Sequence, residues 1–94
     1  MNELELLRKK IDTIDEEIIA LFEERMDTVC NIAKYKLKNN LPVLSQGREK
    51  EVIQKAVDNL KNKNYSESVQ TFIKEIMEIS KEEQNKIFSD EKLV

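Results

Sequence analysis

The stretch ELELLRKKIDTIDEEIIALFEERMDTVCNIAKYKLKNN, residues 3–40, decides the fold because it contains neither glycine nor proline. Its apolar residues recur in alternating steps of three and four, the spacing of a heptad seam along one helix. The residues of this apolar seam are Leu4, Leu7, Ile11, Ile14, Ile18 and Leu21, continued less regularly by Val29, Ile32 and Tyr35. The pattern predicts one very long helix over about residues 2–40, with Asn2 as its N-cap.

The rest of the chain predicts two further helices and no strand. The only proline and the only glycine, Pro42 and Gly47, mark a loop after the long helix. Apolar spacing then predicts a short helix over about 47–62 and a medium one over about 66–88. The last residues, from Ser89 onward, are expected to be frayed. We therefore predict an all-α fold in a single domain, residues 1–94.

The length of the first helix predicts an assembly. A helix of that size is ~55 Å long, whereas a compact chain of 94 residues has a diameter of roughly 32 Å. Because the apolar seam runs along most of the helix, a second copy of the chain is the economical cover for it. The expectation is an intertwined homodimer. The alternative is a helix broken near Asn39–Asn40 or earlier, which would fold as a four-helix monomer.

Composition excludes several classes of protein. Sixteen Lys and Arg against nineteen Asp and Glu give a net charge of −3, and the absence of a basic block argues against nucleic-acid binding. The longest apolar run, residues 18–22, is too short to span a bilayer. The N-terminus shows no secretory signal pattern. We expect a cytoplasmic protein with no membrane or nucleic-acid partner.

The chain has no histidine and a single cysteine, which narrows the chemistry. Ser–His and Cys–His nucleophiles are impossible, and neither an internal disulfide nor a structural zinc site has its ligands. Cys30 has no adjacent base and is interpreted as a small packing residue. A reaction that needs only positioning and fixed charges suits this inventory.

Two cations stand where the long helix should be apolar. Arg25 falls on the apolar seam, and burying a guanidinium is costly unless an anion meets it. Lys36 lies eleven residues further on, ~20° around the helix and ~16 Å along it. The two side chains could converge on a small dianion. Alternatively, they form an internal ion pair with a carboxylate of the third helix, or extend to solvent.

The third helix carries a similar interruption. Ser80 and Gln84 break its apolar face and lie one turn apart, so they share that face. Inward polar groups need partners and could meet a ligand. Alternatively, this face simply turns to solvent near the end of the helix.

Three more charged residues are candidates on weaker grounds. Glu49 and Arg48 stand at the start of the second helix, where charged residues are usually surface groups that complement the helix dipole, although Arg48 has the wrong sign for that. Arg8 lies ~25 Å from Arg25 along the helix. It could reach the same ligand only from the partner chain of an antiparallel dimer, and is otherwise an ordinary exposed arginine.

These residues, taken in order, resemble the all-helical chorismate mutase family over about 80 of the 94 residues. The resemblance rests on Leu7-Arg8, Ile11-Asp12, Ile14-Asp15, Glu24-Arg25, Lys34-Tyr35-Lys36, Pro42-Val43, Arg48-Glu49 and Ser80 followed by Gln84. It implies an intertwined three-helix homodimer. It also implies the Claisen rearrangement of chorismate to prephenate, a step toward phenylalanine and tyrosine that needs no cofactor and no metal.

The resemblance also implies roles for individual residues. Arg25 and Arg8 of the partner subunit would bind the two substrate carboxylates. Lys36 would reach a carboxylate and the breaking ether oxygen, and Gln84 would be the second donor to that oxygen.

The resemblance further implies that Glu49 accepts a hydrogen bond from the ring hydroxyl. Ser80 would assist carboxylate binding, and Arg48 would add positive charge. Ser45 departs from the family pattern, in which Asp is frequent, so only a backbone contact would survive there.

Two other functions remain open from the sequence. An isochorismate–pyruvate lyase on the same scaffold also breaks an ether bond without a cofactor. A non-catalytic helical dimerisation module would use Arg25, Ser80 and Gln84 as internal polar pairs.

Overall fold

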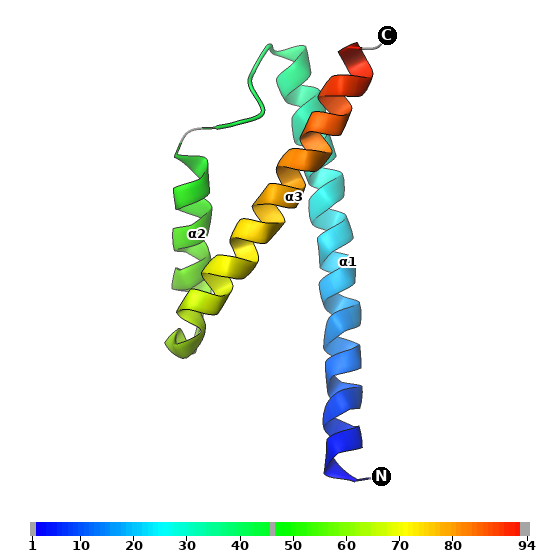
Figure 1. Ribbon diagram of the computed structural model, residues 1–94, viewed down its shortest axis with the longest axis vertical. Helices are drawn as coiled ribbons and strands as arrows, with labels where there is room; N and C mark the ends of the chain where they lie inside the picture. The colour runs from blue at the N-terminus through cyan, green and yellow to red at the C-terminus, as the bar shows by residue number, and fades with distance from the viewer. Residues whose placement is uncertain (1, 46, 93–94) are drawn as a thin grey trace.

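The computed structural model describes residues 2–45 and 47–92 and consists of three α-helices (Figure 1). They are α1 (Glu3–Lys38), α2 (Arg48–Asn59) and α3 (Ser66–Lys92), with a short 3₁₀ turn, η1 (Lys63–Tyr65), before α3. No strand occurs within these residues. The predicted all-α fold, with one very long, one short and one medium helix, is confirmed.

The long helix α1 is continuous over 36 residues, which rules out the four-helix alternative. It begins as predicted, because the Asn2 side chain accepts a hydrogen bond of 2.8 Å from the backbone N–H of Glu5. Glu3 and Glu5 place negative charge in the first turn, where it complements the helix dipole.

The C-terminus of α1 closes in a Schellman motif, two residues before the predicted end. Asn40 adopts the left-handed conformation, with φ of 55°. Its N–H donates to the carbonyl of Leu37 at 3.3 Å, and the N–H of Leu41 donates to the carbonyl of Lys36 at 2.8 Å. Pro42 follows directly and cannot continue the helix. The chain is thereby turned back along the end of α1.

The other two helices differ from their predicted bounds at their C-termini. Helix α2 ends at Asn59 rather than near residue 62, because the backbone becomes extended at Leu60. The Lys63 side chain then donates to the carbonyls of Val57 and Asp58 in the last turn, at 2.7 and 3.3 Å. Helix α3 continues to Lys92, so the predicted fraying from Ser89 is wrong as far as Lys92. No glycine or proline interrupts this segment. Leu93 and Val94 lie outside the described residues.

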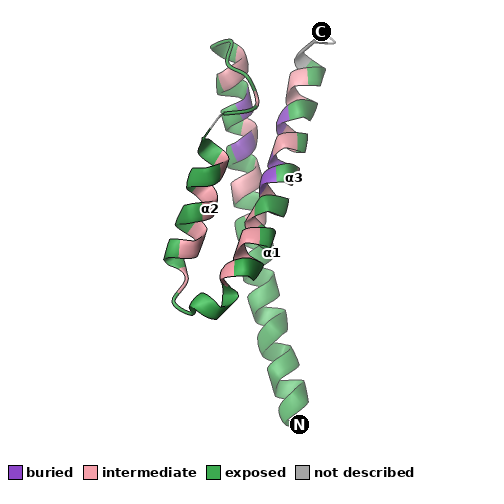
Figure 2. Cartoon of the chain, turned by 60° about the vertical axis from the view of Figure 1, so that its left-hand side comes forward, coloured by how far each residue is buried: buried purple, intermediate pink, exposed green. Residues whose placement is uncertain are grey.

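Helices α1 and α2 both pack against α3. Helix α3 crosses the C-terminal half of α1, and α2 packs along the first half of α3 (Figure 1). Among the residues whose burial is described, the buried apolar ones are Val29 and Ala33 on α1 and Met77 on α3. Buried positions gather where these two helices cross (Figure 2). The core of a single chain is therefore small and confined to one end of α1.

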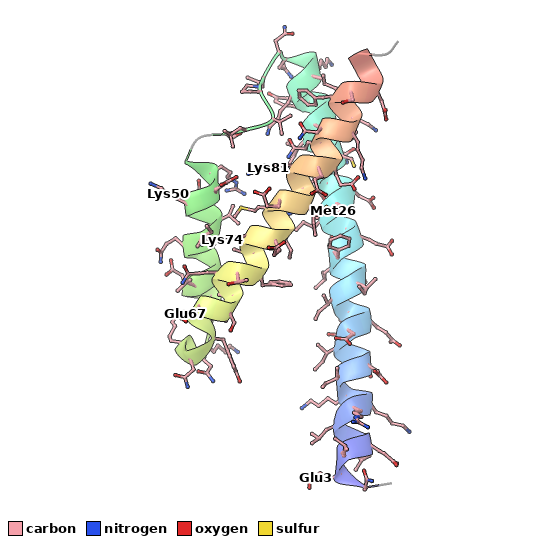
Figure 3. The ribbon with its side chains drawn as sticks, in the orientation of Figure 1. Glu3, Met26, Lys50, Glu67, Lys74 and Lys81 are labelled. Carbon is pink, nitrogen blue, oxygen red and sulfur yellow. The ribbon has the colours of Figure 1, made fainter. Side chains whose placement is uncertain are left out.

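The N-terminal half of α1 stands clear of the other helices. Every residue from Asn2 to Leu21 is exposed (Figure 2). The side chains of this arm project away from the other helices (Figure 3). The six regular residues of the apolar seam lie in this arm and are 43–64% exposed. The chain measures 57 × 27 × 14 Å, and its radius of gyration is 17.0 Å, against ~12 Å for a compact chain of this length. No described helix combines the length and apolar composition that a bilayer crossing requires.

Candidate functional site

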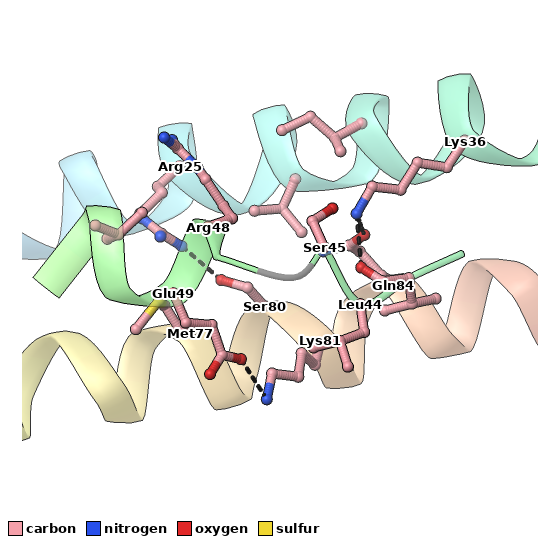
Figure 4. A pocket seen from close by; sticks show the side chains of 14 residues that line it. Arg25, Lys36, Leu44, Ser45, Arg48, Glu49, Met77, Ser80, Lys81 and Gln84 are labelled. Carbon is pink, nitrogen blue, oxygen red and sulfur yellow. Dashed lines mark hydrogen bonds and ion pairs between the residues drawn. The ribbon is translucent and has the colours of Figure 1, made fainter. Parts of the chain in front are cut away.

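A cavity of about 300 Å³ lies between the three helices and the loop that joins α1 to α2 (Figure 4). This volume is at the lower end of the range for small-molecule sites. Seven of the eight residues selected from the sequence line it, namely Arg25, Lys36, Ser45, Arg48, Glu49, Ser80 and Gln84. The eighth, Arg8, does not reach this cavity and is exposed on the arm of α1.

Arg25 extends from α1 toward α3. Its guanidinium donates a hydrogen bond to the hydroxyl of Ser80, which in turn donates to the carbonyl of Ile76 at 2.7 Å. Burial lowers the pKa of Arg25, and the nearby positive charge of Arg48 lowers it further. Arg25 forms no salt bridge with any carboxylate in the described part of the chain. Its positive charge is partly desolvated and has no counter-charge.

Lys36 occupies the other end of the cavity. Its ammonium donates to the backbone carbonyl of Val43 at 2.6 Å and to Oε1 of Gln84 at 3.1 Å. The contact between Lys36 and the Val43 carbonyl depends on the Schellman motif, because this turn brings the chain back so that Val43 lies near Lys36. Burial lowers the pKa of Lys36. Across residues 2–45 and 47–92, Lys36 pairs with no carboxylate.

The two cations thus have neutral partners only. The alternative of an internal ion pair with a carboxylate of the third helix is wrong for both. A partly desolvated cation without a counter-ion is unfavourable, and a bound anion would offset that cost. Arg25 and Lys36 are therefore suited to binding an anion in this cavity.

The polar residues of α3 point inward. Ser80 and Gln84 are among the most buried residues of the chain, 6% and 8% exposed, so this face of α3 does not turn to solvent. Because Oε1 of Gln84 accepts from Lys36, the amide NH₂ remains available as a donor. The hydroxyl of Ser80 already donates to its own helix and accepts from Arg25.

The wall formed by α2 carries mixed charge. Arg48 is exposed and pairs with Glu51 at 3.1 Å on its own helix, while Glu49 pairs with Lys81 of α3 at 2.6 Å. The Ser45 carbonyl accepts from the N–H of Arg48 at 3.2 Å, at the turn into α2. Gly47 adopts a φ of +82° in this turn, a conformation that side chains rarely adopt.

Sequence reasoning missed Lys81, which also lines the cavity. The signal was present, because Met77, Ser80, Lys81 and Gln84 follow the i, i+3, i+4, i+7 spacing of one helix face. Cys30 does not line the cavity, as its interpretation as a packing residue requires. Within the described residues no cluster of His, Cys, Asp and Glu could hold a metal ion.

The fold and cavity define a class: a three-helix protein whose cationic cavity suits a small anion. Comparison with known families is more specific, since the family model of chorismate mutase type II matches residues 7–85. The chain belongs to the chorismate mutase type II family.

Relatives agree with this membership. A bifunctional chorismate mutase/prephenate dehydratase from Aquifex aeolicus (strain VF5) is 47% identical over 55 residues, which are 58% of this chain and 15% of that protein. The protein of the same name from Buchnera aphidicola subsp. Schizaphis graminum (strain Sg) is 35% identical over 97 residues, covering 98% of this chain and 25% of that protein. The chain therefore spans about a quarter or less of the length of these relatives.

A solved structure has the same fold. The conserved hypothetical protein from Pyrococcus furiosus is 36% identical, with a TM-score of 0.73 over 89% of this chain and 97% of that one. The three-helix arrangement is therefore shared by a second chain of nearly the same extent.

The positive charge of Arg25 is not neutralised by an ion pair. We therefore predict that Arg25 favours ligand binding but lowers the stability of the ligand-free protein. Truncation of a half-buried long side chain usually destabilises by about 1 kcal/mol. For Arg25→Met we expect instead a higher Tm of the ligand-free protein, because the change removes a desolvated charge and its repulsion from Arg48. Ser80 keeps its bond to Ile76.

Thermal unfolding followed by circular dichroism measures the effect, with Lys34→Met at an exposed position of α1 as control. A lower Tm for Arg25→Met alone would contradict this account of the site.

Proposed function

We propose that the chain is a chorismate mutase, which converts chorismate to prephenate in phenylalanine and tyrosine biosynthesis. Membership of the chorismate mutase type II family supports the proposal. The observation that carries it is the pair Arg25 and Lys36, two partly buried cations on one cavity with no carboxylate partner. Chorismate supplies two carboxylates.

The reaction fits a protein without histidine. It is unimolecular, with no nucleophile and no proton transfer, and it requires the substrate to be held in a compact, chair-like conformation. No cofactor or metal takes part in it. The site must bind the carboxylates in the reactive geometry and stabilise the negative charge that develops on the breaking ether oxygen.

Lys36 and Gln84 are suited to that second task. The Lys36 ammonium lies 3.1 Å from the Gln84 side-chain oxygen, so donors from both residues lie close to one point. We infer that the ether oxygen occupies this point and accepts from the Lys36 ammonium and the Gln84 NH₂ group. Fixed donors at an oxygen that gains charge act more strongly in the transition state than in the ground state.

The remaining residues would orient the substrate. Arg25 would bind one carboxylate with the help of Ser80, and Glu49 would accept a hydrogen bond from the ring hydroxyl. Arg48 would add positive potential beside Arg25. The carbonyl of Ser45 accepts a hydrogen bond from the N–H of Arg48, which fixes the backbone of the loop at the turn into α2. We therefore assign any contribution of Ser45 to substrate binding to its backbone.

We further propose that the active form is an intertwined homodimer. The accessible surface of the chain is 7813 Å², about 2,200 Å² more than a compact chain of this mass exposes. That excess is close to what one subunit buries in an obligate dimer. A second copy packed along the arm of α1 would cover the apolar seam.

The dimer would also complete the site. In an antiparallel arrangement of the long helices, Arg8 of the partner subunit would approach the cavity and bind the second carboxylate. We propose the cytoplasm as the location of the enzyme, as the sequence predicts.

Chorismate consumption tests the activity, and Lys36→Ala tests the site. We expect prephenate as the product and a fall in kcat/KM of at least about 10–150-fold for Lys36→Ala, because the variant loses a charged donor to the transition state. Lys34→Ala, two residues earlier and exposed, should retain full activity. Release of pyruvate from isochorismate would identify a lyase instead. An inactive wild type whose Tm does not rise with a bicyclic dicarboxylate transition-state analogue would indicate a non-catalytic module.

Gln84→Glu should shift the pH dependence of catalysis toward acid. The ether oxygen needs a donor, and a carboxyl group donates only when it is protonated. Activity of this variant should therefore rise as the pH falls, while the wild type does not follow that trend. A pH–rate profile for kcat/KM measures the difference, and parallel profiles would exclude Gln84 as a donor.

Mixing two inactive variants tests the shared site. We expect Arg8→Ala and Lys36→Ala chains, unfolded and refolded together, to recover part of the wild-type activity. In a mixed dimer, one site would carry both substitutions and the other neither. Tagged chains allow the mixed dimer to be purified. Mixed dimers without recovered activity would contradict the cross-subunit role of Arg8.

A further inference from the structure

Lys81 has no role in the chemistry proposed above, although it lines the cavity from α3. Its ammonium faces Glu49 across the gap between α3 and α2, and the two are joined by an ion pair of 2.6 Å (Figure 4). Glu78, one turn earlier on α3, pairs with the same ammonium at 2.9 Å. Lys81 therefore connects Glu78, on the exposed side of α3, with Glu49, the one carboxylate found on the cavity in the described part of the chain.

The ion pair engages one oxygen of Glu49. Oε1 is shielded from solvent and lies 2.6 Å from the Lys81 ammonium, a charge contact that does not have the geometry of a hydrogen bond. The second carboxylate oxygen is then left to accept a hydrogen bond from a ligand. A carboxylate fixed at one oxygen has less freedom to lose when it binds a hydroxyl at the other.

The pairing also determines which cation Glu49 meets. Among the described residues that line the cavity, Arg25, Lys36, Arg48 and Lys81 are cationic and Glu49 alone is anionic. Pairing of Glu49 with Arg25 or Lys36 would cancel a charge that the substrate carboxylates require. The 2.6 Å contact with Lys81 keeps the carboxylate on the α2–α3 side of the cavity, and Arg25 and Lys36 keep neutral partners.

We propose that Lys81 is a positioning residue: through its ion pair it orients Glu49 toward the ring hydroxyl of the substrate. This inference rests on the proposed mutase function. It assigns no contact between Lys81 and the substrate, so the effect of Lys81 on catalysis passes through Glu49.

The chain offers a matched control on the same helix. Lys86 forms an ion pair of 3.0 Å with Glu83, the residue three positions before it. Lys81 and Glu78 have the same spacing along the helix. Lys86 has no partner on another helix among the described residues and does not line the cavity. Lys81→Met and Lys86→Met therefore remove similar local ion pairs and differ in the contact with Glu49.

The test is a double-mutant cycle on kcat/KM with Lys81→Met, Glu49→Gln and the double variant. We expect Lys81→Met to lower kcat/KM about tenfold, with the loss in the same parameter, kcat or KM, that Glu49→Gln affects. Lys86→Met should stay within twofold of the wild type. The double variant should be no less active than Glu49→Gln alone, because Lys81 has nothing to orient once the carboxylate is gone. Lys81→Arg should recover most of the activity.

Three outcomes would overturn the inference. Multiplicative losses in the double variant would show that Lys81 acts independently of Glu49. An unchanged kcat/KM in Lys81→Met would show that the ion pair with Glu49 does not contribute to catalysis. If Lys81→Met does not fold, Lys81→Arg and Lys81→Gln replace it, and equal activity of these two would overturn the inference. Turnover of chorismate by the wild type and by Lys86→Met reports on the proposed function alone.

Discussion

The lack of an anionic partner for Arg25 and Lys36 is the constraint on which the rest of the site depends. Both cations project from α1 into a partly enclosed space, and both are bonded only to neutral groups. Folding thereby carries an electrostatic cost that no ion pair of Arg25 or Lys36 within the described chain offsets. Such an arrangement is expected where binding an anion is the purpose of the site.

The neutral partners hold the cations without neutralising them. A hydroxyl and a carbonyl satisfy hydrogen bonds while leaving the net charge available to a ligand. Ser80 holds Arg25 from α3, and Val43 holds Lys36 from the loop. The geometry of the site is therefore set before a ligand arrives, which reduces the freedom lost on binding.

The long helix was predictable because its causes are local. Heptad spacing, the Asn2 cap and the absence of breakers all lie within the segment that they shape. The end of α2 was not predictable, because no glycine or proline marks it and its last carbonyls are bonded by the Lys63 side chain from the following turn. Periodicity also placed Arg25, Ser80 and Gln84 on inward faces, which the cavity bears out.

The pairings inside the cavity could not be derived from periodicity. Whether Lys36 meets a carboxylate or a carbonyl depends on the turn at Asn40, and the Glu49–Lys81 contact depends on the separation of two helices. A spacing pattern indicates which face a residue occupies and carries no information about the side chain opposite. The residue that sequence reasoning missed, Lys81, acts across such a gap.

The arm of α1 has a consequence for how the protein is made. Residues 2–21 are all exposed, so within the described chain this arm has no cover of its own. If a second copy provides the cover, the last step of maturation is an encounter between molecules, and its rate depends on how much protein the cell contains. A scarce chain would then be both slow to mature and prone to capture by chaperones, so expression level would itself limit the yield of native protein.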